Sequence, residues 1–126
     1  MTKALSVRQF VAVLATVCLS AGVAWAGPLE DGIKAYTKAD YARANRLLEP
    51  LAQGGDVDAQ YTLASMYLKG QGVSEDKVHA YMWYALAARK GDKDAASDRD
   101  QIASTMTPQQ VEEGKKLVAA WAPKTK

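Results

Sequence analysis

Two stretches in the middle of the chain carry apolar residues at the spacing of an amphipathic helix. In the first, Ala59, Leu63, Met66 and Tyr67 fall at positions i, i+4, i+7 and i+8. The second has the same kind of stripe, formed by Ala80, Trp83, Tyr84, Ala87 and Ala88. Each stripe lies on one face of a helix and has to be covered by another element. Because Gly70-Gln71-Gly72-Val73 separates the stretches, we expect a helical hairpin around a glycine loop.

The boundary of this hairpin recurs along the chain. The run Gly55-Asp56-Val57-Asp58-Ala59 returns as Gly91-Asp92-Lys93-Asp94-Ala95, a period of 36 residues. In each copy, the glycine suits the left-handed conformation past a helix end, and the first aspartate suits the cap of the next helix. A fixed period of this length is typical of a solenoid of stacked helix pairs.

Weaker copies flank the central one. Gly27-Pro28 suits a helix start, and the stripe that follows has Gly32, Ala35 and Tyr36 before a turn at residues 38–40. The next helix carries the stripe Ala44, Leu47, Leu48, Leu51 and Ala52, and Pro50 within it is expected to kink or loosen its last turn. The third copy has a thinner stripe, consisting of Ala95, Ala96, Ile102, Ala103 and Met106, as a terminal repeat should.

The last helix has a clear start. Thr107 suits the N-cap, Pro108 the first helical position, and Gln110 completes a capping box. Its stripe consists of Val111, Gly114, Leu117, Val118 and Trp121. The chain is therefore predicted to be all-α, with about three antiparallel helix pairs in a domain over residues 27–126 and repeats at about 29–54, 55–90 and 91–122.

The central unit resembles the Sel-one-like repeats, a branch of the tetratricopeptide-like solenoids. The matching positions are Ala59, Leu63, Tyr67, Gly70, Gly72, Val73, Asp76, Ala80, Trp83, Tyr84, Ala87, Ala88 and Gly91, while Ala64 stands where the family usually has glycine. The segment from Arg99-Asp100 to Trp121 is similar to the end of many secreted bacterial members. The resemblance implies a right-handed α/α solenoid and a non-catalytic module that binds other proteins.

The first 26 residues have the layout of a secretory signal peptide. Lys3 and Arg8 precede the apolar run 10–19, and Ala24-Trp25-Ala26 is a small-x-small site, which predicts cleavage after Ala26. The mature protein is then expected in the periplasm or outside the cell. The alternative is an uncleaved membrane anchor, because no charge occurs between Arg8 and Glu30.

Composition narrows the classes of partner. The sequence has 126 residues, of which 48% are apolar and 24% charged, as in one ordinary soluble domain. Without Lys3 and Arg8, its 16 basic residues become 14 and equal the 14 acidic residues. This balance argues against nucleic acid or anionic lipid as the partner. The single cysteine, Cys18, leaves with the signal segment, so no disulfide or thiol chemistry is expected in the mature chain.

One short motif supports an enzyme as the alternative. Ser74-Glu75-Asp76-Lys77 matches the Ser-x-x-Lys nucleophile motif of penicillin-binding enzymes, and some relatives in the family are described as acting on β-lactams or cell-wall material. The other elements of that site are missing from the sequence, and those relatives are rich in paired cysteines. We therefore favour Ser74 as a helix N-cap and predict no catalytic residue.

Other chemical residues have simpler interpretations. His79 is the single histidine and is expected to face solvent, and the spacing of Asp92, Asp94, Asp98 and Asp100 does not fit a calcium loop, so we predict no metal and no cofactor. The aromatic residues Trp83, Tyr84 and Trp121 are interpreted as core and not as a ligand-stacking cluster. Tyr81 and Met82 lie off the stripe and are expected to form a satellite contact.

The remaining candidate site is the concave side of the solenoid, which the first helix of each pair lines. The polar positions that point away from the hairpin cores there are Asp31, Lys34, Lys38, Thr62, Ser65, Lys69, Asp98, Gln101 and Thr105. Small polar residues of mixed charge suit another protein or an extended peptide better than a buried small molecule. The same residues suit a merely solvated face equally well.

Overall fold

The structure, a computed structural model, describes residues 27–124, and these residues form six helices and no strand. The helices are α2 (Pro28–Thr37), α3 (Tyr41–Gln53), α4 (Val57–Lys69), α5 (Lys77–Arg89), α6 (Lys93–Ala103) and α7 (Pro108–Ala120). The all-α prediction is confirmed. The predicted signal peptide, residues 1–26, lies outside the described residues.

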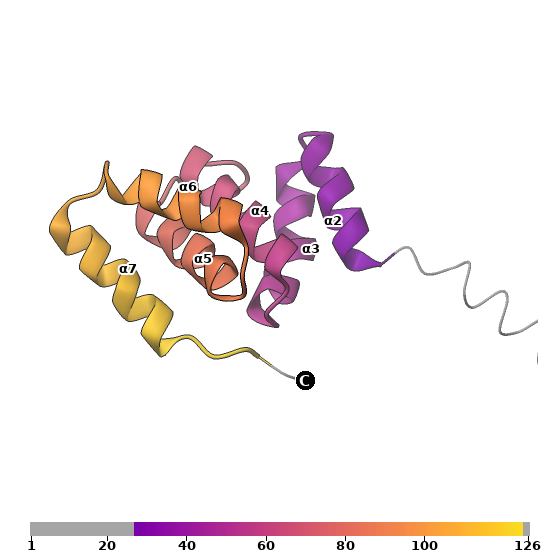
Figure 1. Ribbon diagram of the computed structural model, residues 1–126. Helices are drawn as coiled ribbons and strands as arrows, with labels where there is room; N and C mark the ends of the chain where they lie inside the picture. Colours follow the sequence, from indigo (N-terminus) through magenta and orange to yellow (C-terminus); the bar gives the residue numbers. More distant parts are fainter. Residues whose placement is uncertain (1–26, 125–126) are drawn as a thin grey trace, which may run out of the picture.

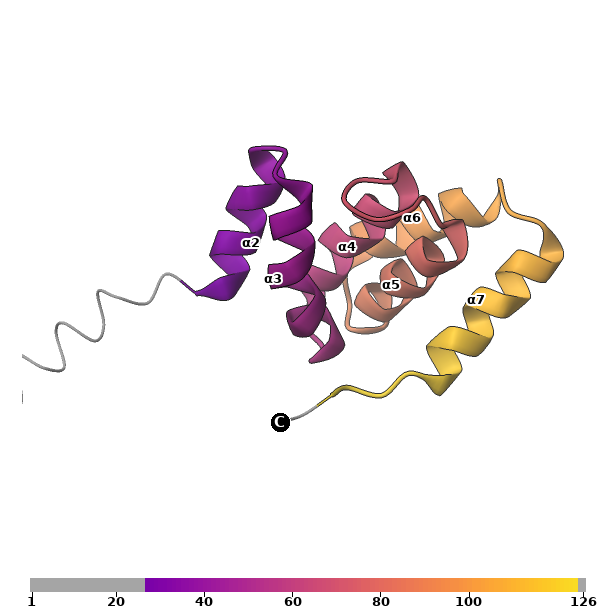
Figure 2. The same ribbon diagram turned by 180° about the vertical axis from the view of Figure 1, so that it is seen from behind.

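The helices stack as a short solenoid. Helices α2 and α3 form one hairpin, α4 and α5 form the next, and α3 packs on α4 where the hairpins meet (Figure 1). Helix α6 packs on α5, and seen from behind the first hairpin lies at one end of the stack and α7 at the other (Figure 2). Both ends of α5 lie 36 residues after those of α3, and the start of α6 lies 36 residues after that of α4. The repeat period read from the sequence thus holds for the helices themselves.

The third pair is more open than the first two. Helix α7 packs along α5, and Figure 1 shows it running away from α6. The physical reason is that α6 buries only Ala95 and Ile102, which leaves little apolar surface to hold α7. Helix α7 instead brings the backbone of Gly114 against the ring of Tyr81, where a Cβ atom on Gly114 would lie 2.5 Å from Cδ1 of Tyr81.

The predicted glycine and aspartate boundaries are confirmed. Gly55 and Gly91 have φ angles of 101° and 104°, which side chains other than glycine rarely adopt. The carboxylates of Asp56 and Asp92 each accept a hydrogen bond of 2.9 Å from the backbone N–H three residues later. The capping box at the start of α7, between Thr107 and Gln110, is also present.

The predicted cap of α5 was wrong. The N-cap is Asp76 and not Ser74, because α5 begins at Lys77, which leaves Ser74 exposed in the preceding loop. The carboxylate of Asp76 accepts a hydrogen bond of 3.1 Å from the backbone N–H of His79, and its second oxygen lies 2.7 Å from Nδ1 of the His79 ring. A carboxylate that engages both groups of His79 is a stronger cap than a more distant serine hydroxyl.

Helix α5 is the centre of the core. Trp83 and Tyr84 are 1% and 3% exposed, which confirms that these two aromatic residues are core, whereas Trp121 is only half-buried and packs against the core from the end of α7. The expectation for Tyr81 and Met82 was wrong, since they are 8% and 7% exposed and belong to the same core. Helix α5 is covered by α4, α6 and α7, so its sides as well as its predicted stripe are buried.

The end of α3 meets the C-terminal tail. Pro50 lies inside α3, and the helix nevertheless continues to Gln53, with the backbone N–H of Gly54 donating to the carbonyl of Pro50 at 3.0 Å. The backbone N–H of Lys124 donates to the carbonyl of Gln53 at 2.8 Å. This bond ties the end of the described chain back to the first hairpin.

Candidate functional site

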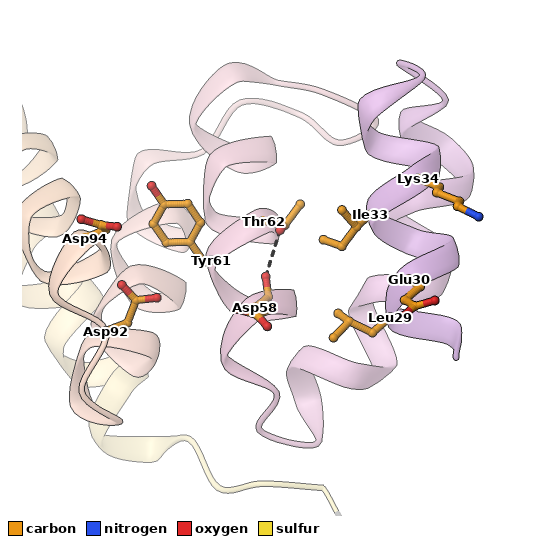
Figure 3. Close-up of a pocket in the computed structure, with 9 residues that line it drawn as sticks. All are labelled: Leu29, Glu30, Ile33, Lys34, Asp58, Tyr61, Thr62, Asp92 and Asp94. Atoms are coloured by element: carbon orange, nitrogen blue, oxygen red, sulfur yellow. Dashed lines mark hydrogen bonds between the residues drawn. The ribbon is translucent and has the colours of Figure 1, made fainter. Parts of the chain in front are cut away.

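Two grooves lie on the side of the solenoid formed by the first helices, α2, α4 and α6. The N-terminal groove, of about 670 Å³, is lined by Leu29, Glu30, Ile33, Lys34, Asp58, Tyr61, Thr62, Asp92 and Asp94 (Figure 3). The C-terminal groove, of about 460 Å³, is lined by Tyr61, Ser65, Leu68, Lys69, Lys77, Tyr84, Asp98, Gln101, Ile102 and Thr105. Tyr61 lines both, so the two grooves adjoin along α4.

The floor of the N-terminal groove is apolar. Leu29 and Ile33 project from α2 toward α4, where Thr62 points back toward Ile33 (Figure 3). Both α2 side chains are half-buried and pack on the edge of the core. The hydroxyl of Thr62 donates to the backbone carbonyl of Asp58 at 2.9 Å, so this polar group is satisfied within α4. The floor therefore offers mostly hydrocarbon to a bound side chain.

The rim of this groove is acidic. Its carboxylates come from all three helices of the surface, with Glu30 on α2, Asp58 on α4, and Asp92 and Asp94 at the start of α6, and Lys34 is the one basic residue among the lining residues. Within residues 27–124 the ion pairs are His79 with Asp76 and Arg99 with Asp100, so none of the four rim carboxylates is neutralised by a salt bridge there.

A tyrosine pair separates the two grooves. The hydroxyl of Tyr61 donates to the carboxylate of Asp98 at 2.6 Å, which links α4 to α6. The ring of Tyr61 meets the ring of Tyr84 edge to face, with centroids 5.3 Å apart. One repeat earlier, the hydroxyl groups of Tyr36 and Ser65 lie 3.4 Å apart and link α2 to α4. These contacts set the spacing of the helices that line the grooves.

The same contacts perturb the ionisation of the two rings. The hydrogen bond to Asp98, followed by burial, raises the pKa of Tyr61. Burial, followed by the charge of Asp98, raises the pKa of Tyr84 from 10.0 to about 12. Both shifts arise because a phenolate here would lose water and face a carboxylate.

Stability is therefore expected to fall at alkaline pH. Because both folded pKa values lie above the ordinary value of 10.0, the stability that each protonated tyrosine contributes is complete below pH 10. The contribution of Tyr84 is lost as the pH rises through about 12, and that of Tyr61 is also lost on the alkaline side. Denaturant unfolding monitored at pH 9 to 12 should show this fall, and Tyr84→Phe should reduce it. A Tyr84→Phe variant with an unchanged alkaline profile would contradict the assignment.

The structure places the nine predicted positions on or beside the first helices. Lys34 and Thr62 line the N-terminal groove, whereas Asp31 and Lys38 line neither groove. The other five line the C-terminal groove, namely Ser65, Lys69, Asp98, Gln101 and Thr105. Three of these five are engaged within the chain, since Ser65 and Asp98 contact tyrosines and Thr105 accepts a hydrogen bond of 3.1 Å from Nζ of Lys77. That these nine residues contact a partner stays a prediction.

Sequence reasoning missed the apolar floor and the acidic rim. Leu29 and Ile33 are four residues apart, which is a helical spacing, but they lie outside the stripe of Gly32 and Ala35 that packs on α3 and matches the central repeat. Asp92 has the capping role that the sequence predicts, and it also lines the groove. The signal for the floor was present as a second, shorter stripe on the same helix.

The residues of the enzyme alternative do not form a catalytic arrangement. Ser74 lies in the exposed loop before α5, and Lys77, the first residue of that helix, donates to Thr105. His79 is half-exposed and stacks on Tyr67, with ring centroids 5.3 Å apart. Burial of Asp76 opposes its ionisation, but its hydrogen bonds from His79 outweigh this effect and lower the pKa of Asp76.

Between residues 27 and 124, no three His, Cys, Asp or Glu side chains are grouped so as to hold a metal ion. None of the helices in that range combines the length and the apolar character needed to cross a bilayer.

Comparison with known proteins identifies the repeat. The model of the Sel1 repeat matches residues 24–56 and 57–92, so it covers more than half of the chain and includes the two hairpins that frame the N-terminal groove. The chain is also 30% identical over 69 residues to the alginate biosynthesis protein AlgK of Azotobacter vinelandii. That alignment covers 55% of this chain and 15% of AlgK. Sel1 repeats in general mediate protein–protein interactions and are non-catalytic. The chain belongs to the Sel1 repeat family.

Proposed function

We propose that this protein is a non-catalytic adaptor or scaffold of the bacterial cell envelope, which binds another protein or an extended peptide on the surface of α2, α4 and α6. The observation that carries the proposal is the N-terminal groove, in which the apolar side chains Leu29 and Ile33 of α2 face α4 of the next repeat (Figure 3). Its volume of about 670 Å³ is in the range of ligand-binding clefts. An apolar centre surrounded by polar groups is the usual arrangement of a protein-binding surface.

The geometry favours this function over an enzyme acting on β-lactams or the cell wall. Neither groove contains Ser74 or His79, and the one basic residue of the motif, Lys77, is bonded to Thr105. Binding needs only the shape and polarity of the grooves. The serine of the enzyme alternative therefore lies outside both grooves, which fits an adaptor.

Location in the envelope is part of the proposal and rests on residues 1–26. Their charged start, apolar run and small-x-small site support export and removal at Ala26. Mass spectrometry of the exported protein is expected to give Gly27 as the first residue. A chain that begins at Met1 and stays with the membrane would favour the anchor alternative.

The binding proposal is tested by filling the groove. Ile33→Trp adds a large side chain to the floor of the groove. We expect it to reduce recovery of the partner from envelope extract by about tenfold or more, because the added ring occupies the space that a side chain of the partner would fill. Arg43→Trp is the matched control, since it adds the same ring at an exposed position on α3. If a folded Ile33→Trp protein recovers the same partner as efficiently as Arg43→Trp, the groove is not the binding site.

A further inference from the structure

We infer that the N-terminal groove selects a protein segment in which a large apolar residue is flanked by lysine or arginine. This inference rests on the proposed function and deepens it by naming the chemistry of the partner. It follows from two properties of the same groove, the hydrocarbon floor and the sign of the charge around it.

The floor requires an apolar anchor. Leu29 and Ile33 are half-buried, so a bound side chain that covers them removes apolar surface from water. The hydroxyl of Thr62, whose side chain faces Ile33 in Figure 3, already donates within α4. A purely charged ligand, such as a free polyamine, would leave this floor in contact with water. The occupant therefore has to bring an aliphatic or aromatic side chain.

The rim requires basic residues beside that anchor. Four carboxylates and one lysine line the groove, so its formal charge is −3 although residues 27–126 carry 14 basic and 14 acidic residues. The acidity is thus local to this groove. Among the residues of the adjoining C-terminal groove, Lys69 and Lys77 outnumber Asp98. The change of sign along one surface gives a partner segment a preferred position.

Other observations agree with a negative potential at this place. The pKa of Tyr61, which lines the groove, is raised first by its hydrogen bond to Asp98 and by burial, and the charge of Asp94 on the rim raises it further. The rim carboxylates form no salt bridge within residues 27–124, so no ion pair in that range neutralises their attraction to a partner. A metal ion is a poor alternative occupant, since the described residues hold no group of three suitable ligands and a metal would not use the apolar floor.

The test uses the purified protein and a displayed library of short random peptides. Peptides that bind the native protein but not Ile33→Trp are collected, so the selection reports on the groove. We expect the collected peptides to carry a large apolar residue with lysine or arginine nearby. Their affinity should also fall as the salt concentration rises, because exposed charge pairs are screened.

Charge-reversal variants then test the role of the rim charges separately from the shape of the groove. Asp58→Lys with Asp94→Lys should weaken binding of a collected peptide about tenfold, because two attractive pairs become repulsive. Glu112→Lys with Glu113→Lys is the matched control, since both residues are exposed on α7. Lys34→Glu should strengthen binding. If the lysine variants melt early, Asp58→Asn with Asp94→Asn replaces them, and a weaker effect in the same direction is expected.

The outcomes separate this inference from the proposed function. One outcome is that the collected peptides lack basic residues and bind the Asp58→Lys, Asp94→Lys variant with unchanged affinity. That result would overturn the inference and leave the adaptor function standing. If no peptide distinguishes the native protein from Ile33→Trp, both fail. Self-association of the native chain that Ile33→Trp abolishes would make a second copy the occupant and would also overturn the inference.

Discussion

Replacing Trp83 with alanine is expected to lower the free energy of unfolding by about 3–5 kcal/mol, which is a large part of the stability of a domain of this size. Trp83 is 1% exposed and lies in the middle of α5, the helix that α4, α6 and α7 cover. Its indole N–H has no hydrogen-bond acceptor among residues 27–124, so its contribution is packing. The alanine variant therefore loses burial and leaves a cavity. Thermal unfolding should show a decrease in Tm of at least about 12 °C.

The matched control is Trp121→Ala, which removes the same ring from a half-buried position at the end of α7. The guanidinium of Arg89 lies 5.9 Å from the centre of the Trp121 ring, an exposed contact of about 0.5–1 kcal/mol. Trp121→Ala is therefore expected to lower the free energy of unfolding much less than Trp83→Ala does. Equal losses at the two positions would show that α5 is not the centre of the core.

Gly72→Ala is expected to destabilise the protein by more than about 2 kcal/mol. Gly72 has a φ angle of 73°, a left-handed conformation that costs other residues about 1–2 kcal/mol. A Cβ atom at this position would also lie 2.7 Å from the backbone oxygen of Tyr41. The glycine loop docks there on the first hairpin, and Nε2 of Gln71 donates to the Tyr41 hydroxyl at 3.1 Å. The substitution thus strains the loop and pushes the hairpins apart.

Gly70→Ala separates these two costs. Gly70 has a similar φ angle of 67°, but a Cβ atom there would meet its nearest neighbour, Glu75, at an ordinary distance of 3.4 Å. Gly70→Ala should therefore lower the free energy of unfolding only by the conformational cost of about 1–2 kcal/mol. Denaturant unfolding of both variants measures the difference. If Gly70→Ala is as destabilising as Gly72→Ala, close contact with Tyr41 is not what requires glycine in this loop.

Local signals in the sequence predicted most of the fold. The apolar stripes, the glycine and aspartate at each boundary, and the capping box at Thr107 are properties of one or two helices, and the structure confirms them. The burial of Tyr81 depends on α7 returning over α5, a contact between segments about 30 residues apart. Periodicity within α5 contains no information on that contact.

The candidate site was predicted less completely than the fold. The sequence indicated the helices that line the two grooves, because the first helix of each pair lines one side of a solenoid. The groove itself depends on how far α2, α4 and α6 stand apart, which contacts such as Tyr61 with Asp98 decide. A solvated face was therefore equally compatible with the sequence. Asp92 and Asp58 acquire their place at the rim only when two repeats are stacked.

The most direct test of the central claim is photo-crosslinking from single positions in cells that produce the full chain. A photoreactive amino acid in place of Lys34 or Asp58, both exposed at the N-terminal groove, is expected to form a discrete crosslink to another protein. The same amino acid in place of Arg43 on α3 or Lys116 on α7, which are also exposed, should not form it. A crosslink that forms from Arg43 or Lys116 but not from Lys34 or Asp58 would contradict the claim that the surface of α2, α4 and α6 binds the partner.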